Sequence, residues 1–462
     1  MLHIRPVTAI LSASILALMA GCAQKQPPAT APDRPPVSNE DPMSEGFLRS
    51  IPKTSKGTVT ELTEPQIQLS LVPPDNPDPA TNAQIQQYLN GLAAKGHLSQ
   101  HQGVWIQSGN TLLANHQGTV PLPAASVTKV ATTLAALETF GPDHRFVTLI
   151  SATGPIYEGV LQGNLVVKGG EDPFFVWEEA IALGNLLNQR GIRRVAGNLI
   201  VVGKFYMNFE ANPLTAGKLL QQGLNYQTWS AEVETQYQTL PPGTPRPQVI
   251  INGFVRFALE NPPNAQTLVR HYSFPLAELL KKMNRYSNNL MADMLANTVG
   301  GARVVALKAA DRAGVPRGEI QLVNGSGLGF TNQISPRAAV ALFLAIERYL
   351  QPYNMTVADL FAIVGLDRGI LDTRPRIPQL AVVKSGALDN VSTLAGALPT
   401  RKQGTVWFAI MNFGNDLVRF RAQQEALLQT FVKHWGAVSS LPPELKPLPQ
   451  RKSKTSRSEI AN

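Results

Sequence analysis

The chain has 462 residues, of which 44% are hydrophobic and 16% charged, so it can bury a large core and is not a wholly disordered protein. Its single cysteine, Cys22, excludes an intrachain disulfide and a multi-cysteine zinc site. The formal net charge of +9 permits an acidic partner. Aromatic residues make up only 7% and no finger or basic-helix motif is present, so we expect no nucleic acid partner.

The first 22 residues read as an export signal. A positively charged start precedes an apolar stretch over residues 7–20, which is short for a transmembrane helix but typical of a signal core. The segment ends in LMAGC at residues 18–22, which resembles the lipobox of bacterial lipoproteins, whose cysteine is lipidated. We therefore expect export to the periplasm and a lipid anchor on Cys22, with Ala23 favouring the outer membrane. An ordinary cleaved signal is the alternative.

Two proline-rich polar stretches flank a globular body. Residues 23–76 carry repeated prolines that interrupt helix and strand, and we interpret them as a disordered tether. Residues 438–462 combine prolines with lysine and arginine, and we predict a disordered, solvated basic tail.

Hydrophobic periodicity predicts the elements of the body, which show no fixed repeat. A helix over 84–94 precedes strands 103–107 and 111–115, joined by a hairpin turn, and then a buried helix that begins near Ser126. The remaining predicted elements are strand 164–167, helix 178–189, strand 198–202, helices 276–284, 290–298 and 338–350, strands 379–383, 392–398 and 405–412, and helix 417–435. This order favours an α+β fold with an antiparallel sheet over alternating βαβ units.

The first candidate site is Ser126-x-x-Lys129, at the start of the buried helix. Positions i and i+3 share one face of a helix, so the lysine amine can reach the serine hydroxyl. A serine needs an adjacent base to become a nucleophile, and a desolvated lysine with a lowered pKa can serve. Alone the motif is weak, because a helix cap beside a solvated lysine is the common explanation and Ser50-x-x-Lys53 also matches.

Two more short motifs follow. Ser287-Asn288-Asn289 lies between two predicted helices, where its hydroxyl could relay a proton and its amide could bind a substrate carbonyl; a plain helix cap is the alternative. Lys384-Ser385-Gly386 ends the predicted strand 379–383, where an edge strand could pair with an extended peptide, the lysine and serine could hold a carboxylate, and the glycine permits close backbone approach. The alternative there is an ordinary strand end.

In this order the three motifs resemble the signature of penicillin-binding proteins and serine β-lactamases, with Lys-Ser-Gly in place of Lys-Thr-Gly. Three longer segments sharpen the resemblance: PAASVTK at 123–129, GNLVVKGGEDP at 163–173, and NGSGL at 324–328, where Asn324 replaces an aspartate. Over roughly residues 84–435 the chain is similar to the class C low-molecular-mass penicillin-binding proteins, the D-alanyl-D-alanine carboxypeptidase/endopeptidase family.

The resemblance implies a penicillin-binding/serine β-lactamase-like transpeptidase fold, an antiparallel sheet flanked by helices. The catalytic domain is then expected over 77–142 and 263–437, with an inserted accessory domain over 143–262. The separation between Lys129 and Ser287 is short for the family, so we expect this insertion to be reduced.

The resemblance also implies a serine-type D-Ala-D-Ala carboxypeptidase acting on peptidoglycan stem peptides, with endopeptidase action left open. Lys129 would deprotonate Ser126, which would attack the carbonyl of the penultimate D-alanine. Ser287, with Lys129 or Lys384, would pass a proton to the departing D-alanine, and Asn289 would position the peptide.

Residues of the third motif complete the implied site. The backbone N–H groups of Ser126 and Ala387 would form an oxyanion hole. Lys384 and Ser385 would hold the terminal carboxylate beside Gly386. Penicillins are the expected covalent inhibitors, and no metal or organic cofactor is expected.

Two other functions stay open on the sequence. A β-lactamase or esterase on the same site would need fast deacylation, for which no motif assigns a base. A wall-binding lipoprotein scaffold with a retired catalytic domain would bind without cleaving, although the intact motif residues argue against decay.

Overall fold

A computed structural model of the chain describes residues 71–449 and 455–461. The expected signal peptide with Cys22, and the expected tether up to residue 70, lie outside the described residues. The end of that tether differs from the expectation, because Val72 is buried in the core and the Asn115 side chain donates a hydrogen bond to the carbonyl of Pro74. The globular body therefore begins before residue 77.

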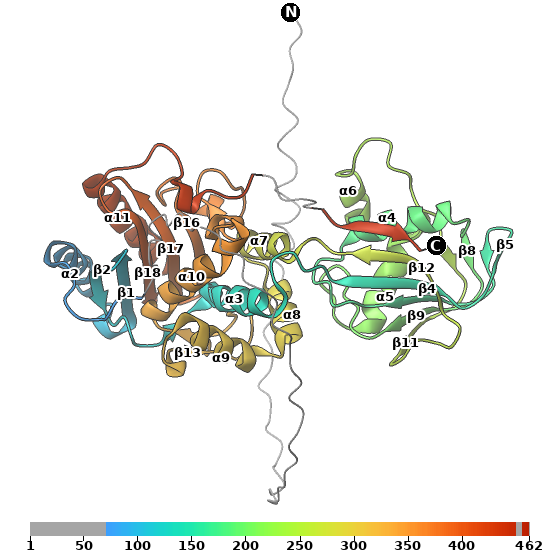
Figure 1. Ribbon diagram of the computed structural model, residues 1–462, viewed down its shortest axis with the longest axis horizontal. Helices are drawn as coiled ribbons and strands as arrows, with labels where there is room; N and C mark the ends of the chain where they lie inside the picture. Colours follow the sequence, from blue (N-terminus) through green and yellow to red (C-terminus); the bar gives the residue numbers. More distant parts are fainter. Residues whose placement is uncertain (1–70, 450–454, 462) are drawn as a thin grey trace, which may run out of the picture. The chain divides into compact units, whose positions relative to one another are not determined.

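A six-stranded antiparallel sheet forms the centre of the first lobe, in the order β15-β16-β17-β18-β1-β2 (Figure 1). The early hairpin β1–β2 joins the late strands because β1 pairs with β18. The strands are β1 Gln102–Ser108, β2 Thr111–His116, β15 Ala362–Ile363, β16 Val382–Leu388, β17 Val391–Thr400 and β18 Gly404–Phe413. The antiparallel sheet expected from the sequence is confirmed.

Helices cover both faces of this sheet. Successive strand residues point to opposite faces, so each strand contributes side chains to two cores. Trp407 of β18 belongs to the core beneath α3 and α10, whereas its neighbour Phe408 packs in the core with α2 and α11. The helices of this lobe are α2 Pro79–Ala93, α3 Thr128–Phe140, α7 Leu276–Tyr286, α8 Asn289–Val299, α9 Ala302–Ala313, α10 Pro336–Leu350 and α11 Leu417–Trp435. A small sheet of order β13-β14-β3 adds β3 Leu122–Pro123, β13 Ile320–Gln321 and β14 Gln333–Ile334.

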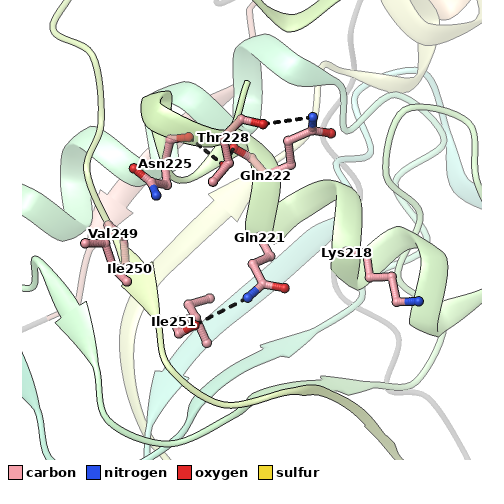
Figure 2. A pocket seen from close by; sticks show the side chains of 8 residues that line it. All are labelled: Lys218, Gln221, Gln222, Asn225, Thr228, Val249, Ile250 and Ile251. Atoms are coloured by element: carbon pink, nitrogen blue, oxygen red, sulfur yellow. Dashed lines mark hydrogen bonds between the residues drawn. The ribbon is translucent and has the colours of Figure 1, made fainter. Parts of the chain in front are cut away.

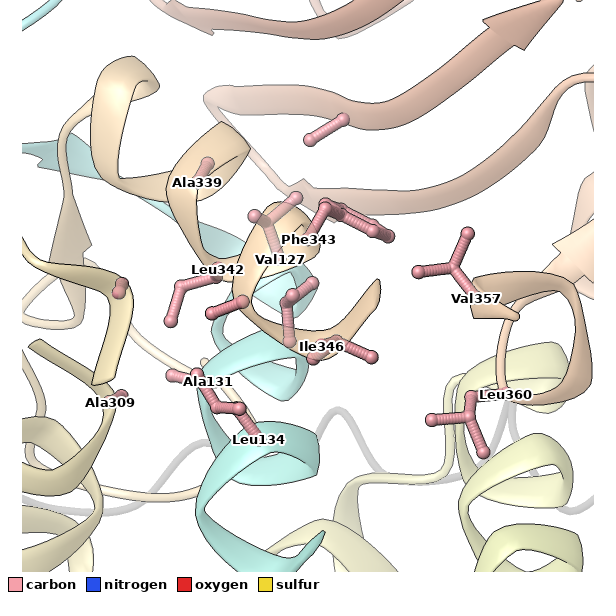
Figure 3. Packing of buried hydrophobic residues seen from close by; sticks show 14 of the residues in the cluster. Val127, Ala131, Leu134, Ala309, Ala339, Leu342, Phe343, Ile346, Val357 and Leu360 are labelled. Carbon is pink, nitrogen blue, oxygen red and sulfur yellow. The ribbon is translucent and has the colours of Figure 1, made fainter. Parts of the chain in front are cut away.

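Helix α3 is buried around most of its circumference, from Thr128 to Leu137. A helix that is largely apolar all round belongs in the middle of a core. Figure 3 shows Ala131 and Leu134 of α3 packed against side chains of α10, among them Leu342 and Ile346. This packing fixes α3 from several sides and so fixes the residues at its start.

Within the described residues, no single helix is long and apolar enough to cross a membrane; only α8 and α9, taken together as a pair bent by 80°, meet that test.

The second lobe is the expected insertion, and its sheet has the order β11-β9-β7-β4-β12-β19. Here β7, β9 and β11 are parallel, with α4 between β7 and β9 and two helices between β9 and β11. This βαβαβ arrangement was not predicted from the sequence. The elements are β4 Val147–Ala152, β7 Leu165–Lys168, α4 Trp177–Gln189, β9 Leu199–Val202, α5 Pro213–Gly223, α6 Ala231–Tyr237, β11 Val255–Ala258, β12 Gln266–Tyr272 and β19 Arg457–Ile460. A four-stranded sheet of order β10-β8-β6-β5 adds β5 Ile156–Tyr157, β6 Val160–Leu161, β8 Arg194–Val195 and β10 Ile250–Ile251.

The structure corrects the expectation of a disordered tail over 438–462. Leu445 is fully buried, and residues 457–460 form β19, antiparallel to β12 (Figure 1). The strand is held by side chains as well as by pairing, since Ser458 Oγ lies 2.9 Å from Nδ1 of the buried His271. The sheet also extends past the expected boundary at residue 262, because β12 is one of its strands.

Candidate active site

Ser126 lies in the 3₁₀ turn Ala125–Val127, immediately before α3. The preceding segment is fixed by β3 and by a hydrogen bond from the Ala124 backbone N–H to the carbonyl of Asn332. Lys129, one turn further on, donates a hydrogen bond from Nζ to Ser126 Oγ over 2.9 Å. The serine is partly exposed and the lysine fully buried. The helix start and the Ser126–Lys129 contact expected from the sequence are therefore present.

The amine of Lys129 has two further acceptors. Its Nζ donates to Asn289 Oδ1 and to the carbonyl of Ser326, each over 2.7 Å. Burial lowers the pKa of Lys129 well below its usual value, and the positive charge of Lys384 lowers it further, against the opposing effect of Asp293. A lysine with such a pKa loses a proton readily; the neutral amine then has two N–H groups for Asn289 and Ser326 and a lone pair that accepts from the Ser126 hydroxyl, as a general base must.

Ser287 is paired with the other lysine of the motifs. Lys384 Nζ donates to Ser287 Oγ over 2.9 Å and to the Ser385 carbonyl over 2.7 Å, and burial lowers the pKa of Lys384 to about 7. Ser287 adopts a left-handed backbone with φ of 54° at the end of α7, an uncommon conformation for this residue type. The N-cap of α8 is Asn288, whose side chain accepts from the Met291 N–H, so Ser287 is not the helix cap that the sequence offered as an alternative.

The third motif lies inside β16, and the expectation that it ends the strand is wrong. Its strand partner β17 runs alongside from Val382 to Leu388, whereas β15 pairs only with Val382 and Val383. The edge of β16 beyond Val383 is therefore open among the described residues. Because backbone groups alternate along a strand, and the Ala381 carbonyl faces β15, the N–H groups of Ser385 and Ala387 face the open edge. This is the direction that an oxyanion hole at Ala387 requires.

Gly386 brings this strand against the nucleophile. A Cβ on Gly386 would lie 2.7 Å from the backbone nitrogen of Ser126 and 3.0 Å from the Ala125 Cβ. Real Cβ atoms essentially never approach a neighbour as closely as the first of these distances. Only glycine at this position lets β16 and the Ser126 turn meet.

The loop 324–328 closes the other side of Lys129. Besides the Ser326 carbonyl that accepts from the lysine, Gly325 donates its N–H to Asp293 Oδ1 over 2.9 Å, and Thr132 Oγ1 donates to the Gly325 carbonyl over 2.7 Å. A Cβ on Gly327 would overlap the Ala125 carbonyl. Reasoning from the sequence singled out this loop by resemblance but gave no role to Ser326, Asp293 or Thr132.

The structure thus brings together the expected site residues that it describes. Ser126 is paired with Lys129 and Ser287 with Lys384, and the segment 385–387 lies in β16, against the Ser126 turn. Asn289 contacts the first pair, because its Oδ1 accepts a hydrogen bond from Lys129 Nζ. This contact orients the lysine and adds to the expected role of Asn289 in positioning the peptide. Cys22 lies outside the described residues.

Comparison with known proteins assigns the chain to a family. Residues 85–208 and 249–432 match the sequence model of the D-Ala-D-Ala carboxypeptidase 3 (S13) family. The match covers more than half of the chain, and the chain belongs to this family. The segment 209–248, within the insertion, lies outside the match.

Individual relatives agree with this assignment. D-alanyl-D-alanine carboxypeptidase DacB of Haemophilus influenzae is 23% identical over 402 residues, which cover 65% of this chain and 82% of that protein. Bd3459, a predatory peptidoglycan endopeptidase from Bdellovibrio bacteriovorus, has a similar solved structure, with a TM-score of 0.61, 20% identity, and coverage of 77% of this chain and 98% of the other. Penicillin binding protein 4 (dacB) from Haemophilus influenzae gives a TM-score of 0.59 at 19% identity, with coverage of 75% and 99%. These structures share the fold expected from the sequence.

Proposed function

We propose that this family member is a serine-type D-Ala-D-Ala carboxypeptidase that cleaves peptidoglycan stem peptides through an acyl-enzyme on Ser126. The observation that carries the proposal is that each of the two site serines has a lysine of its own. Lys129 contacts the Ser126 hydroxyl, and Lys384 contacts the Ser287 hydroxyl. One pair can activate the nucleophile while the other handles the leaving group.

Acylation begins at Ser126. Lys129 accepts the hydroxyl proton as Oγ attacks the carbonyl carbon of the penultimate D-alanine and forms the new C–O bond. The backbone N–H groups of Ser126 and Ala387 stabilise the negative charge that develops on the carbonyl oxygen. Hydrogen bonds from the amine to Asn289 and Ser326 keep Lys129 in place for this transfer.

Departure of the terminal D-alanine needs a proton on its nitrogen. Ser287 gives up its hydroxyl proton to that nitrogen as the C–N bond breaks, and Lys384 replaces the proton on the serine. A pKa near 7 allows Lys384 both to donate this proton and to recover one at neutral pH. Water then attacks the ester and releases the shortened peptide from Ser126.

The open edge of β16 supports substrate binding in an extended conformation. The N–H groups of Ser385 and Ala387 and the carbonyl of Ala387 are available there for main-chain pairing, whereas the Ser385 carbonyl already accepts from Lys384 Nζ. Lys384 and Ser385 are neighbours on this strand, and they are the residues that would hold the terminal carboxylate. Cleavage of a peptide cross-link uses the same acyl-enzyme, and its products distinguish it from carboxypeptidase action.

D-Alanine release from a soluble stem pentapeptide ending in D-Ala-D-Ala tests the proposal. The protein should release one D-alanine per peptide, with no release from the peptide ending in L-Ala-L-Ala, and Ser126→Ala should be inactive. Hydrolysis of penicillin without action on either the pentapeptide or a cross-linked dimer would instead assign a β-lactamase. Absence of all three activities would assign a scaffold role.

We also propose that the mature protein is an exported lipoprotein, anchored through Cys22 on the periplasmic side, in the outer membrane. The LMAGC sequence at the end of the signal core and the position of the sole cysteine support this proposal. Separated membrane fractions of cells that express the wild type or Cys22→Ser test it. The wild type should fractionate with the outer membrane and the variant should be soluble; equal distribution of the two would refute the anchor.

A further inference from the structure

A groove in the second lobe lies apart from the residues of the proposed reaction. It has a volume of about 400 Å³ and is formed by α5, the 3₁₀ turn Tyr226–Thr228 and β10 (Figure 2). Its apolar lining is formed by Val249, Ile250 and Ile251, and its polar lining by Lys218, Thr228 and the amides of Gln221, Gln222 and Asn225. These three amides belong to segment 209–248, which the family match leaves out. The groove therefore joins a segment outside the match to β10, which lies inside it.

Asn225 supplies a donor that has no partner among the described residues. The residue is only 7% exposed, and its Oδ1 accepts from the backbone N–H of Gln227. That contact leaves Nδ2, which donates no hydrogen bond to any described residue and is turned toward the side of Val249 and Ile250 in Figure 2. This nitrogen is open to solvent, so the acceptor of a ligand can take the place of water on it.

The backbone of β10 adds a second donor. The N–H groups of Ile250 and Asn252 donate toward β8, to the carbonyls of Arg193 and Val195. By alternation, the N–H and carbonyl of Ile251 face α5 instead, and the carbonyl accepts from Gln221 Nε2 over 3.5 Å. The Ile251 N–H is thus directed to the groove.

The two glutamines present acceptors. Gln221 and Gln222 use their Nε2 atoms on the carbonyls of Ile251 and Thr228, so that both Oε1 atoms are left for a ligand. The groove therefore combines two N–H donors, the charged amine of Lys218, two carbonyl acceptors and an apolar surface from two isoleucines.

We propose that this groove binds the acetamido group of an N-acetylated amino sugar in the glycan strand of peptidoglycan. An acetamido group carries one carbonyl acceptor, one N–H donor and one methyl group, which match these donors, acceptors and isoleucines. The inference goes beyond the proposed reaction. It rests on that reaction only in taking peptidoglycan as the polymer on which the protein acts.

A peptide fits the groove less well. Addition of a strand uses alternate residues along an open edge. Here only Ile251 faces the groove with both backbone groups, because the Val249 N–H already bonds to the Leu224 carbonyl. One residue of edge gives no length for an extended peptide, whereas a single sugar needs none.

Calorimetric titration of the full mature protein with N,N′,N″-triacetylchitotriose tests the proposal. The acetylated sugar should bind, and cellotriose, which has hydroxyls in place of the acetamido groups, should bind at least about tenfold more weakly. Equal affinities for the two sugars, or no binding of the acetylated one, would overturn the proposal.

Asn225→Asp is the informative variant, because it keeps the Oδ1 that caps the turn and replaces only the Nδ2 donor. Binding should weaken by about tenfold, while D-alanine release from the soluble pentapeptide stays at the wild-type rate. Gln227→Ala, on the exposed side of the same turn, is the matched control and should bind normally. Wild-type affinity in Asn225→Asp would refute the site.

A second variant guards against misfolding. If Asn225→Asp unfolds, Gln221→Leu removes an acceptor without touching the turn, and it should weaken binding by a similar factor. The pentapeptide assay separates the two proposals. Sugar binding without D-alanine release would overturn the reaction and leave the groove, and the reverse would overturn the groove alone.

Discussion

Gly386 and Ser126 meet backbone to backbone: a Cβ on the glycine would lie 2.7 Å from the serine nitrogen. The open-edged strand and the nucleophile are thus fixed to each other through main-chain atoms. That contact places the Ser126 turn next to the open edge of β16, where the oxyanion of the proposed reaction would form.

Gly386→Ala should therefore slow acylation by penicillin by about a hundredfold or more, because the new methyl group must push β16 or the Ser126 turn aside. Stopped-flow measurement of acylation gives the rate. Gly318→Ala is the matched control, since a Cβ there meets nothing within 4 Å. A wild-type rate in Gly386→Ala would show that the close approach does not matter for the reaction.

The pKa of Lys384 near 7 predicts the alkaline limb of the pH profile. The lysine is charged below that pKa and neutral above it, so kcat/KM for a substrate with a free carboxylate should fall as pH rises through about 7. Lys129 must be neutral to act as a base, so the acid limb follows its lowered pKa.

Lys384→Met tests the assignment of the alkaline limb. The variant should be about a hundredfold less active and its alkaline limb should disappear. Lys168→Met, at an exposed lysine of β7, should keep the wild-type profile. An unchanged limb in Lys384→Met would assign it to another group.

Glu347 predicts a pH dependence of stability. Burial raises its pKa from 4.5 to about 8, although its carboxylate accepts the Val357 N–H. The folded state then binds more protons than the unfolded state between these values, so this residue lowers the free energy of unfolding as pH rises from 4.5 to about 8, by at most about 1.4 kcal/mol per pH unit.

Glu347→Gln should remove that loss, because the amide oxygen can still accept from Val357 and carries no charge. Thermal unfolding should show a higher Tm than wild type at pH 8 and little difference at pH 5. Glu260→Gln, at an exposed position, is the control. An equal effect of Glu347→Gln at both pH values would contradict the account.

Contacts of the C-terminal strand β19 should contribute to the free energy of unfolding. Ser458→Ala removes the hydroxyl that contacts His271 Nδ1 and leaves this buried nitrogen with only Glu179 Oε2, 3.8 Å away, so the free energy of unfolding should fall by about 1–3 kcal/mol. Glu459→Ala, on the exposed side of the same strand, should be nearly neutral. Chemical denaturation of the two variants gives the comparison, and equal stabilities would remove the structural role of Ser458.

The elements that carry the reaction were predictable because their patterns are local. The helix after Ser126 follows from apolar spacing, and the Ser126–Lys129 contact follows from the geometry of one helical turn. The amide of Asn289 and the carbonyl of Ser326 reach the same amine from distant parts of the chain, and no local pattern encodes such a contact.

The parallel pairing within the insertion and the C-terminal strand could not be predicted for a related reason. Strands such as β9 and β11 are four residues long, so their periodicity is too brief to distinguish parallel from antiparallel pairing. The strand Arg457–Ile460 is polar in sequence, and its place is set by contacts with distant residues, such as its pairing with β12 and the contact of Ser458 with His271. Its basic composition indicated a solvated tail.

The central claim is that Ser126 is the nucleophile, and intact-protein mass spectrometry after incubation with benzylpenicillin tests it most directly. The wild type should gain the mass of one penicillin, and Ser126→Ala should gain nothing. Lys129→Met should acylate far more slowly, since its serine lacks a base. An adduct that persists in Ser126→Ala, or a wild type that gains no mass and consumes no penicillin, would contradict the account.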